Sequence, residues 1–449
     1  MKKSKKFVLA GLVLLAAITM VLLPLAGCKT EVDTSSPQQE QTKDTNDNAG
    51  TGGGDTSDNP SAGNDGENGT VPETPATKLV SISVTTPPTR TVYSVGQSFD
   101  PTGMKVTATY DDGEERTVTG TITTDTSTLT QSAGVQTVTV SYTDEETSKT
   151  TTFTVTVFPE EVKVLTDYES PNNTDDNWTY VAFGEWPQTI LKGDVEVDES
   201  EGKKIGMFTY YLGDDGNHYV KAEENAYKAG YKYSDDSEVK QKDESESSSP
   251  STRWFKVEPI VWRVLTTNYE VPEGGTGGEV LLLAEKILTS GIKWADSKND
   301  YMESNIRQWL NGNSVTGETS DYSGTPGFLQ TAFTQSDWEL IADTTVDNIP
   351  GKGTTDKVFL LSEEEATTSV YGFAAEGIKD STRIRDTTDY AKATGAEQSS
   401  SGGWWWLRSP HSYHGDFVRV IKRDGDDTSH YNYVRTDGGV VPALSISLQ

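Results

Sequence analysis

The chain has 449 residues, enough for two or three domains, and a formal net charge of −31 at pH 7. A surface this acidic repels phosphate backbones, so we expect no nucleic-acid partner. Cys28 is the only cysteine, which excludes an intramolecular disulfide, a redox cysteine pair and a zinc site built on several cysteines.

The N-terminus has the order of a bacterial secretion signal. Basic residues within 2–6 precede an apolar run at 7–23. The tetrad Leu25-Ala26-Gly27-Cys28 then resembles the lipobox, before whose cysteine the signal is cut and at whose cysteine acyl chains are attached. We expect 1–28 to be a lipoprotein signal, with Cys28 lipidated and the protein held at the bacterial surface, in the outer membrane. A plain signal peptide or a membrane anchor is the alternative.

Residues 29–77 consist mainly of Gly, Ser, Thr, Asn, Asp, Glu and Pro, with almost no large apolar residue. Such a segment cannot bury enough surface to offset its chain entropy. We therefore expect a disordered tether that holds the next domain on the order of tens of ångströms from the membrane.

Short runs that alternate apolar residues with Thr or Ser follow the tether. They occupy 79–84, 105–110, 137–142 and 152–157. This alternation predicts an all-β antiparallel sandwich over 78–158. The segment resembles the bacterial immunoglobulin-like (Ig-like) repeat of surface proteins, and the resemblance rests on Tyr93, Gly96, Phe99, Gly103, Val106, Tyr110, Gly113, Gly134 and Tyr142. We expect this domain to act as a spacer.

The C-terminal region, residues 165–449, carries all ten tryptophans. Apolar runs predict strands at 259–265, 279–288, 357–362, 416–423 and 440–448. Helices are predicted at 301–312 and 336–342. Ser362 and Glu365 predict a capping box that opens a further short helix, and the polar segment 229–253 predicts a mobile loop. Since helices and strands do not alternate regularly, we expect an α+β domain.

The sequence holds no recognisable catalytic motif: a P-loop, a nucleophile elbow and an HExxH helix are all missing. A Ser-His-Asp arrangement on His411, His414 or His430 would lack a nucleophile context. The same histidines could form a zinc or copper site, but we favour contact residues. Asp424-Gly425-Asp426-Asp427 lacks the spacing of an EF-hand and predicts a turn. We expect no enzymatic activity, no metal and no cofactor.

After Trp404-Trp405-Trp406 the chain becomes both polar and aromatic. Tyrosine gives a large contact area at low conformational cost, while Ser, Asn and Gly give adaptable hydrogen bonds. Arginine and tyrosine are also frequent among binding hot spots. Residues 411–437 combine all of these types, which predicts a recognition surface. An ordinary polar loop is the alternative.

The genetic code offers an independent indication for this segment. Randomising the first two bases of the asparagine codon AAC yields every amino acid except Trp, Met, Gln, Lys and Glu. These types make up 88 of the 449 residues, so about five are expected among the 27 positions from His411 to Asp437. Only Lys422 occurs, which favours a segment written from such codons.

Five C-terminal motifs resemble the variable proteins of diversity-generating retroelements, specifically the spirochaetal lipoprotein type called treponemal variable protein A. They are Phe183–Gln188 (FGEWPQ), Ile260–Leu265 (IVWRVL), Ile306–Asn311 (IRQWLN), Trp405–Pro410 (WWLRSP) and Gly439–Leu444 (GVVPAL). The resemblance implies a C-type lectin fold of the formylglycine-generating-enzyme subtype. In that family a reverse transcriptase copies a template, with adenine-directed errors, into the C-terminal region, here about 404–449. Oxidases of the subtype need cysteines, which this region lacks.

Carried over to this chain, the resemblance implies a fixed platform at 404–410 and a set of variable, ligand-binding residues after it. The set is His411, Ser412, Tyr413, His414, Phe417, Arg419, Ile421, Arg423, Ser429, His430, Tyr431, Tyr433 and Arg435. Strand alternation assigns the scaffold role to Val418, Val420, Asp424, Gly425 and Val434. Phe417 and Ile421 could instead belong to the core.

The sequence thus predicts a surface lipoprotein that presents a diversified site to an unknown protein or glycan ligand on another cell or a host surface. One alternative is an invariant adhesin or structural protein of the cell envelope. Another is an enzyme of the formylglycine-generating-enzyme fold, which a metal bound at the three histidines would support.

Replacing Cys28 with Ala removes the only thiol that can be acylated. We expect the Cys28→Ala variant to take up no tagged fatty acid in growing bacteria and to keep its uncut signal segment, whereas Ser35→Ala in the tether behaves as wild type. Wild-type labelling of Cys28→Ala would contradict the lipidation.

Overall fold

The computed structural model describes residues 77–171, 178–241, 251–269, 278–315, 322, 324–348, 353–426 and 431–448. All of them belong to the compact unit Glu73–Gln449. The predicted signal 1–28, with Cys28, and all but the last residue of the predicted tether lie outside the described residues. Within the described part, no helix combines the length and the apolar character needed to cross a membrane.

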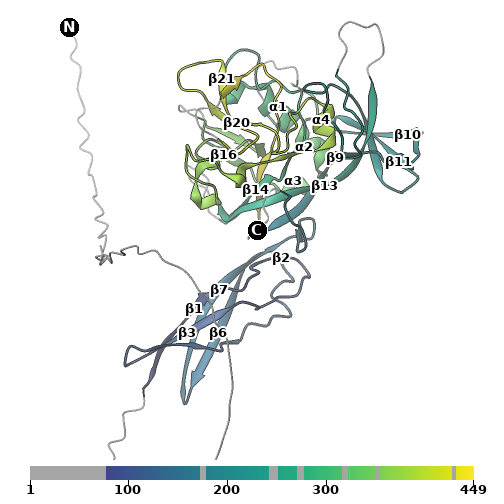
Figure 1. Cartoon of the computed structure of the whole chain (residues 1–449). Helices are drawn as coiled ribbons and strands as arrows, with labels where there is room; N and C mark the ends of the chain where they lie inside the picture. The colour runs from purple at the N-terminus through teal and green to yellow at the C-terminus, as the bar shows by residue number, and fades with distance from the viewer. Residues whose placement is uncertain are drawn as a thin grey trace, which may run out of the picture. The chain divides into compact units, whose positions relative to one another are not determined.

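Two sheets packed as a sandwich form the N-terminal domain of the described chain (Figure 1). One sheet contains β1 (Leu79–Thr86), β3 (Lys105–Tyr110) and β4 (Glu115–Val118). The other, in spatial order, contains β2 (Val92–Ser94), β7 (Thr147–Phe158), β6 (Gly134–Asp144) and β5 (Thr121–Ile122). The four predicted strands are confirmed, because period-two alternation places residues such as Val138 and Val155 in the core and Thr137 and Thr154 outside.

A nine-stranded sheet is the centre of the C-terminal domain. The 18-residue strand β13 (Thr252–Tyr269) organises it, since successive parts of its length pair with three neighbours, β12, β9 and β14. The remaining members are β8 (Lys163–Leu165), β9 (Tyr180–Ile190), β10 (Val197–Ile205), β11 (Phe208–Gly213), β12 (His218–Glu223), β14 (Glu279–Ala284), β18 (Val358–Phe359) and β23 (Ala443–Ser447).

Smaller elements cover this sheet. Three further sheets of the described C-terminal domain are β15 (Lys286–Ile287) with β19 (Asp386–Thr387), β16 (Thr344–Val346) with β17 (Thr354–Asp356), and β20 (Trp405–Pro410) with β21 (Phe417–Ile421) and β22 (Tyr431–Tyr433). The α-helices are α1 (Asn305–Asn311), α2 (Phe328–Ala332), α3 (Asp337–Leu340) and α4 (Asp389–Ala393). The 3₁₀ helices are η1 (Tyr301–Glu303), η2 (Gly312–Ser314), η3 (Glu365–Thr367), η4 (Ser369–Tyr371) and η5 (Ser381–Arg383).

Most predicted elements exist, but several are shorter than predicted. The strand expected at 279–288 is interrupted at Glu285, whose carboxylate turns to the buried Arg263 at 2.8 Å. The helix expected at 301–312 is a 3₁₀ turn followed by α1, because Ser304 caps a new helix there. The capping box is confirmed as reciprocal hydrogen bonds between Ser362 and Glu365, although it opens a 3₁₀ helix.

The prediction of a mobile polar loop at 229–253 is wrong for much of that segment. Tyr231, Tyr233 and Val239 are buried in the main core, and Tyr233 donates its hydroxyl to Glu224 at 2.9 Å. Three apolar residues spaced among charged ones gave no periodic signal, yet each buries a large side chain. Residues 242–250 lie outside the described chain.

Tryptophan dominates the core of the C-terminal domain. Trp186 is fully buried, contacts the rings of Phe208, Trp309 and Phe328, and donates its indole N–H to the carbonyl of Leu288 at 3.1 Å. Each buried indole therefore adds buried apolar area to the core. Where its N–H finds a hydrogen-bond acceptor, that bond also fixes the orientation of the ring. This core extends without a break to β20, so the strand that precedes the predicted variable region is part of it.

A buried ion pair lies beneath β20. Arg408 donates to Glu365 through both terminal nitrogens, and its Nη1 also donates to the carbonyl of Leu360 at 2.7 Å. Burial alone raises the pKa of the Glu365 carboxyl, but the charge and hydrogen bonds of Arg408 outweigh it and hold the pKa below its ordinary value. The folded protein thus favours the ionised carboxylate.

Glu365→Gln should lower the free energy of unfolding at pH 7 by about 3–5 kcal/mol, because it leaves the Arg408 charge buried without a partner. The carboxylate stabilises the fold above its unfolded-state pKa of about 4.3, and this contribution is lost as the pH falls through the lower folded-state pKa. Urea unfolding followed by tryptophan fluorescence should therefore show a deficit that shrinks below about pH 4.3. A deficit independent of pH, or equal in the exposed control Glu364→Gln, would contradict this assignment.

Candidate functional site

The predicted variable region folds as two strands laid on the tryptophan strand. β21 pairs with β20 through Trp405 opposite Ile421 and Trp406 opposite Val420. β22 pairs with β21 through Phe417 opposite Tyr433. Because Trp405 and Trp406 are fully buried, the inner face of this small sheet is continuous with the core. In Figure 1, β21 (yellow) lies on the side of the domain away from β10 and β11.

Six aromatic side chains gather on the outer side of this sheet, and we call them the aromatic surface: His411, Tyr413, His414, Phe417, Tyr431 and Tyr433. Ring centroids lie 4.0 Å apart for Phe417 and Tyr433, and 4.3 Å apart for His411 and Tyr431. Tyr413, Tyr433 and Tyr431 remain 88%, 54% and 42% exposed. Such a large exposed aromatic area is unusual on a soluble domain unless it meets a partner.

The structure places the other predicted site residues differently. Arg419 lies on β21 and pairs with Glu363 at 3.2 Å. Arg423 lies in the turn after that strand, where it pairs with Glu397 at 3.0 Å. Ser412 is exposed beside the aromatic surface, and Arg435 is exposed with its Nε donating to the carbonyl of Asp296 at 2.6 Å. Ser429 and His430 lie outside the described residues.

Ile421 is a correction to the predicted site. Its side chain is fully buried opposite Trp405, so it cannot contact a ligand. Strict alternation along β21 would expose this residue, because Phe417 and Arg419 are half-exposed and Val418 and Val420 are buried. The strand ends at Ile421, and the chain there turns its last side chain into the core.

Asn299 anchors the loop that carries His411 and His414. Its side-chain Nδ2 lies within hydrogen-bonding distance of the carbonyls of His411 (3.2 Å), His414 (3.0 Å) and Phe417 (2.9 Å). Its backbone N–H also donates to the carbonyl of Gly415 at 2.8 Å. Every one of these acceptors belongs to the main chain, so the anchor does not depend on which side chains the loop carries.

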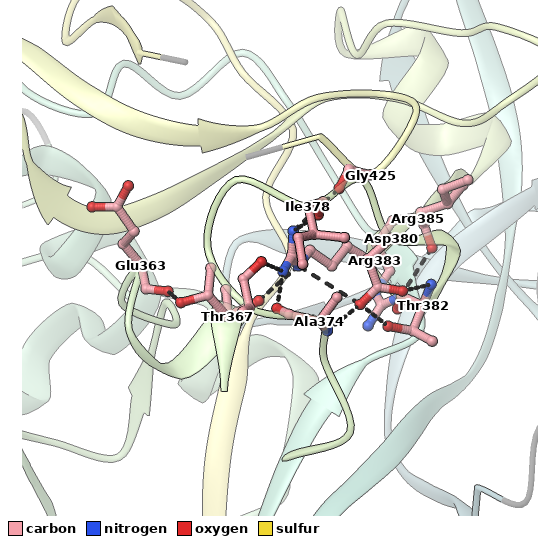
Figure 2. A network of polar contacts seen from close by, with 12 residues as sticks. Glu363, Thr367, Ala374, Ile378, Asp380, Thr382, Arg383, Arg385 and Gly425 are labelled. Carbon is pink, nitrogen blue, oxygen red and sulfur yellow. Dashed lines mark hydrogen bonds and ion pairs between the residues drawn. The ribbon is translucent and has the colours of Figure 1, made fainter. Parts of the chain in front are cut away.

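The turn after β21 is anchored in the same way, as Figure 2 shows. The carbonyl of Gly425 accepts hydrogen bonds from the backbone N–H of Asp380 (3.2 Å) and from Nη1 of the buried Arg383 (3.4 Å). Gly425 has a φ of +76°, and an added Cβ would lie 1.9 Å from the carbonyl oxygen of Asp380. The prediction that Asp424 and Gly425 form a turn is confirmed, and the glycine is required there by contact as well as by conformation.

Sequence reasoning did not identify Asn299, Glu363 or Arg383 as supports of this region. All three lie far from residues 411–435 along the chain, and the capping box that contains Glu363 gave no hint of this contact, so only the tertiary structure brings them together. Only Asn299 carries a weak sequence signal. It lies in a polar stretch directly before Asp300, which caps the 3₁₀ helix η1.

The surroundings of His411 favour its neutral form. Desolvation lowers the pKa of His411, and the charges of Arg419 and His414 lower it further. The rings of His411 and His414 lie 5.2 Å apart. Among the residues that the structure describes, no group of three His, Cys, Asp or Glu side chains is placed to hold a metal ion. His430, the third histidine of the metal alternative, is outside that set.

Comparison with known protein families finds a match in each of the two described domains, although the second match begins only at residue 277, within the nine-stranded sheet domain. Residues 86–157 match the bacterial Ig-like domain (group 3), so the N-terminal sandwich is an Ig-like domain. Residues 277–448 match a domain of unknown function, DUF6273, which includes the aromatic surface and the strands beneath it. No curated protein matches the chain. The protein is therefore multidomain and mostly β-stranded, with an Ig-like domain followed by a domain whose function the match leaves open.

Tyr413→Ala and Ile421→Ala separate the exposed side chains from those that support them. Tyr413 is 88% exposed, so its loss should change the free energy of unfolding by less than about 0.5 kcal/mol. Ile421 is fully buried, so its loss should cost about 2–5 kcal/mol. Urea unfolding of both variants, followed by tryptophan fluorescence, checks this. Similar losses at the two positions would mean that the aromatic surface is part of the folding core.

Proposed function

We propose that this protein is a surface-displayed lipoprotein whose C-terminal domain presents a hypervariable ligand-binding site, diversified by a retroelement, on a C-type lectin fold of the formylglycine-generating-enzyme subtype. One observation carries the proposal. An exposed cluster of aromatic side chains lies on a chain segment whose two loops are hydrogen-bonded to the rest of the domain through main-chain carbonyls.

The composition and exposure of the aromatic surface support a role in recognition. Aromatic side chains supply much of the binding free energy in protein interfaces, because they bury a large area with few rotatable bonds. Here Phe417 is packed between Tyr431 and Tyr433, at ring distances of 4.9 Å and 4.0 Å. Neighbouring rings thus hold each other in place before a ligand arrives, which lowers the entropy lost on binding.

The anchoring supports diversification. Asn299 and Arg383 hold the two loops by carbonyl oxygens, which every amino acid has. Val418, Val420 and Val434 supply the buried side chains that keep β21 and the segment after β22 in place. Exposed positions between these fixed points can change at small cost in stability. The motifs around this region resemble retroelement-diversified proteins. A retroelement would supply the substitutions that these exposed positions tolerate.

The partner that best fits is a protein or a glycan on another cell or a host surface. The lipidated Cys28 would hold the chain in the bacterial outer membrane, and the tether and the Ig-like domain would extend the aromatic surface outward. With a net charge of −31, the protein is a poor match for nucleic acid. We propose no enzymatic activity and no cofactor.

An invariant adhesin is the second candidate, because the aromatic surface would serve it equally well. It differs in one respect only, since the same residues would stand at 411–435 in every copy of the gene.

Recognition is tested by comparing two triple variants of the full chain. Wild type is screened against an array of glycans and purified cell-surface proteins, and the best-bound member becomes the probe. The Tyr413→Ala, Tyr431→Ala, Tyr433→Ala variant should bind that probe at least roughly tenfold more weakly, because each ring is an exposed contact.

The control variant, Tyr227→Ala, Val370→Ala, Ile378→Ala, removes three exposed apolar side chains from elsewhere on the same domain. Its affinity should equal that of wild type. Unchanged binding in the first variant would place recognition away from the aromatic surface and contradict the proposal.

A further inference from the structure

A second concave feature of the C-terminal domain lies outside the aromatic surface. It is a cavity of about 230 Å³, bounded by β9, β15, β19, the start of α4 and the loop 398–402. At roughly 30 Å³ per water molecule, it has room for about seven waters. It is therefore smaller than the roughly 300–1,000 Å³ of sites that take drug-sized ligands, and it suits a small molecule.

Every residue that lines this polar cavity, apart from Gly402, has a polar side chain, which argues against an apolar ligand. Hydroxyl groups come from residues such as Thr189, Thr387 and Ser399. Gln188 uses its Nε2 on the carbonyls of Glu258 and Pro259, which leaves its Oε1 as an acceptor. Gln398 accepts from the backbone of Lys232 through Oε1, which leaves its Nε2 as a donor.

Two of the four charged side chains in the lining are already committed. Asp389 and Lys392 form an ion pair of 2.9 Å, and both are buried. The Asp389 carboxylate also accepts from the backbone of Ile190 and from the backbone and hydroxyl of Ser234. These four hydrogen bonds use the whole accepting capacity of a carboxylate, so this pair is structural.

The other two charged side chains, Lys286 and Asp386, are free. Both are half-buried, and neither side chain makes a hydrogen bond or an ion pair with any residue in the described part of the chain. They stand opposite each other in the parallel ladder of β15 and β19, so their backbones are separated by about one strand spacing, 4.7–4.9 Å. One positive and one negative group are thus held side by side in a polar cavity.

We propose that the polar cavity is a binding site for a small zwitterion of the α-amino acid class, with a polar side chain. Lys286 pairs with the ligand carboxylate, Asp386 pairs with its ammonium group, and the free amide atoms of Gln188 and Gln398 meet its polar side chain. A simple anion or cation would leave one of the two charges unpaired, and an uncharged sugar would leave both. A zwitterion alone neutralises the pair.

Unlike the aromatic surface, this cavity is lined by residues that are not predicted to vary. None of the predicted variable residues at 411–435 lines the cavity. The same small ligand would therefore be taken whatever side chains the aromatic surface carries, and the inference does not depend on the proposed function.

Isothermal titration of the full chain with L-glutamine, L-serine and glycine tests the assignment. Acetate and methylammonium, which carry one charge each, serve as probes of the single interactions. We expect at least one amino acid to bind, and Lys286→Gln and Asp386→Asn each to weaken it by roughly tenfold or more. The exposed control Lys203→Gln should leave the affinity unchanged. Because neither cavity charge has a partner among the described residues, both variants should unfold at the wild-type temperature.

Three results would overturn the proposal. The first is the absence of binding by all three amino acids at millimolar concentration. The second is equal affinity of wild type and both cavity variants, or of the amino acids and the single-charge probes. The third is a coupling between Lys286→Gln and Asp386→Asn in the stability of the ligand-free protein, which would show that the two charges pair with each other.

Discussion

The pairing of β21 with the tryptophan strand β20 is the constraint on which the C-terminal site depends. Trp405 and Trp406 are buried in the core of the domain, and Ile421 and Val420 lie opposite them. Along β21, the buried Val418 and Val420 alternate with the half-exposed Phe417 and Arg419, so one face of the strand is fixed by packing and its other face points outward. The aromatic surface is the direct consequence, because β22 adds Tyr431 and Tyr433 to that outer face.

A protein that changes its binding residues needs loops that keep their shape when their side chains change. Side-chain anchors would be lost with each substitution, whereas main-chain anchors are retained. The side chains of Asn299 and Arg383, which lie outside the predicted variable region, hold it at main-chain carbonyls. Gly425 cannot be replaced by another residue without moving the turn, since a Cβ there would collide with the carbonyl oxygen of Asp380. The buried pair of Arg408 and Glu365 keeps the supporting strand in place from below.

The sequence predicted the features that depend on local pattern. Alternation located the Ig-like strands, because a period is visible in a few residues. The run of tryptophans indicated a buried platform at 404–410, although not that it forms the strand β20. It misassigned Ile421, since alternation does not reveal where a strand ends, and it missed the burial of Tyr231 and Tyr233 in a polar segment. Asn299 and the free charges of Lys286 and Asp386 could not be predicted, because they acquire meaning only from partners, or missing partners, distant in the chain.

The central claim is that the exposed residues at 411–435 vary while the buried ones beneath them do not. Sequencing the DNA downstream of the gene, together with many copies of the gene itself, tests it most directly. The account predicts a near-copy of codons 404–449 that differs mainly where adenine stands, with substitutions at Tyr413, Tyr431 and Tyr433. Val418, Val420 and Ile421 should stay constant. The absence of such a copy and of a neighbouring reverse transcriptase gene, with identical residues in every copy of the gene, would contradict it.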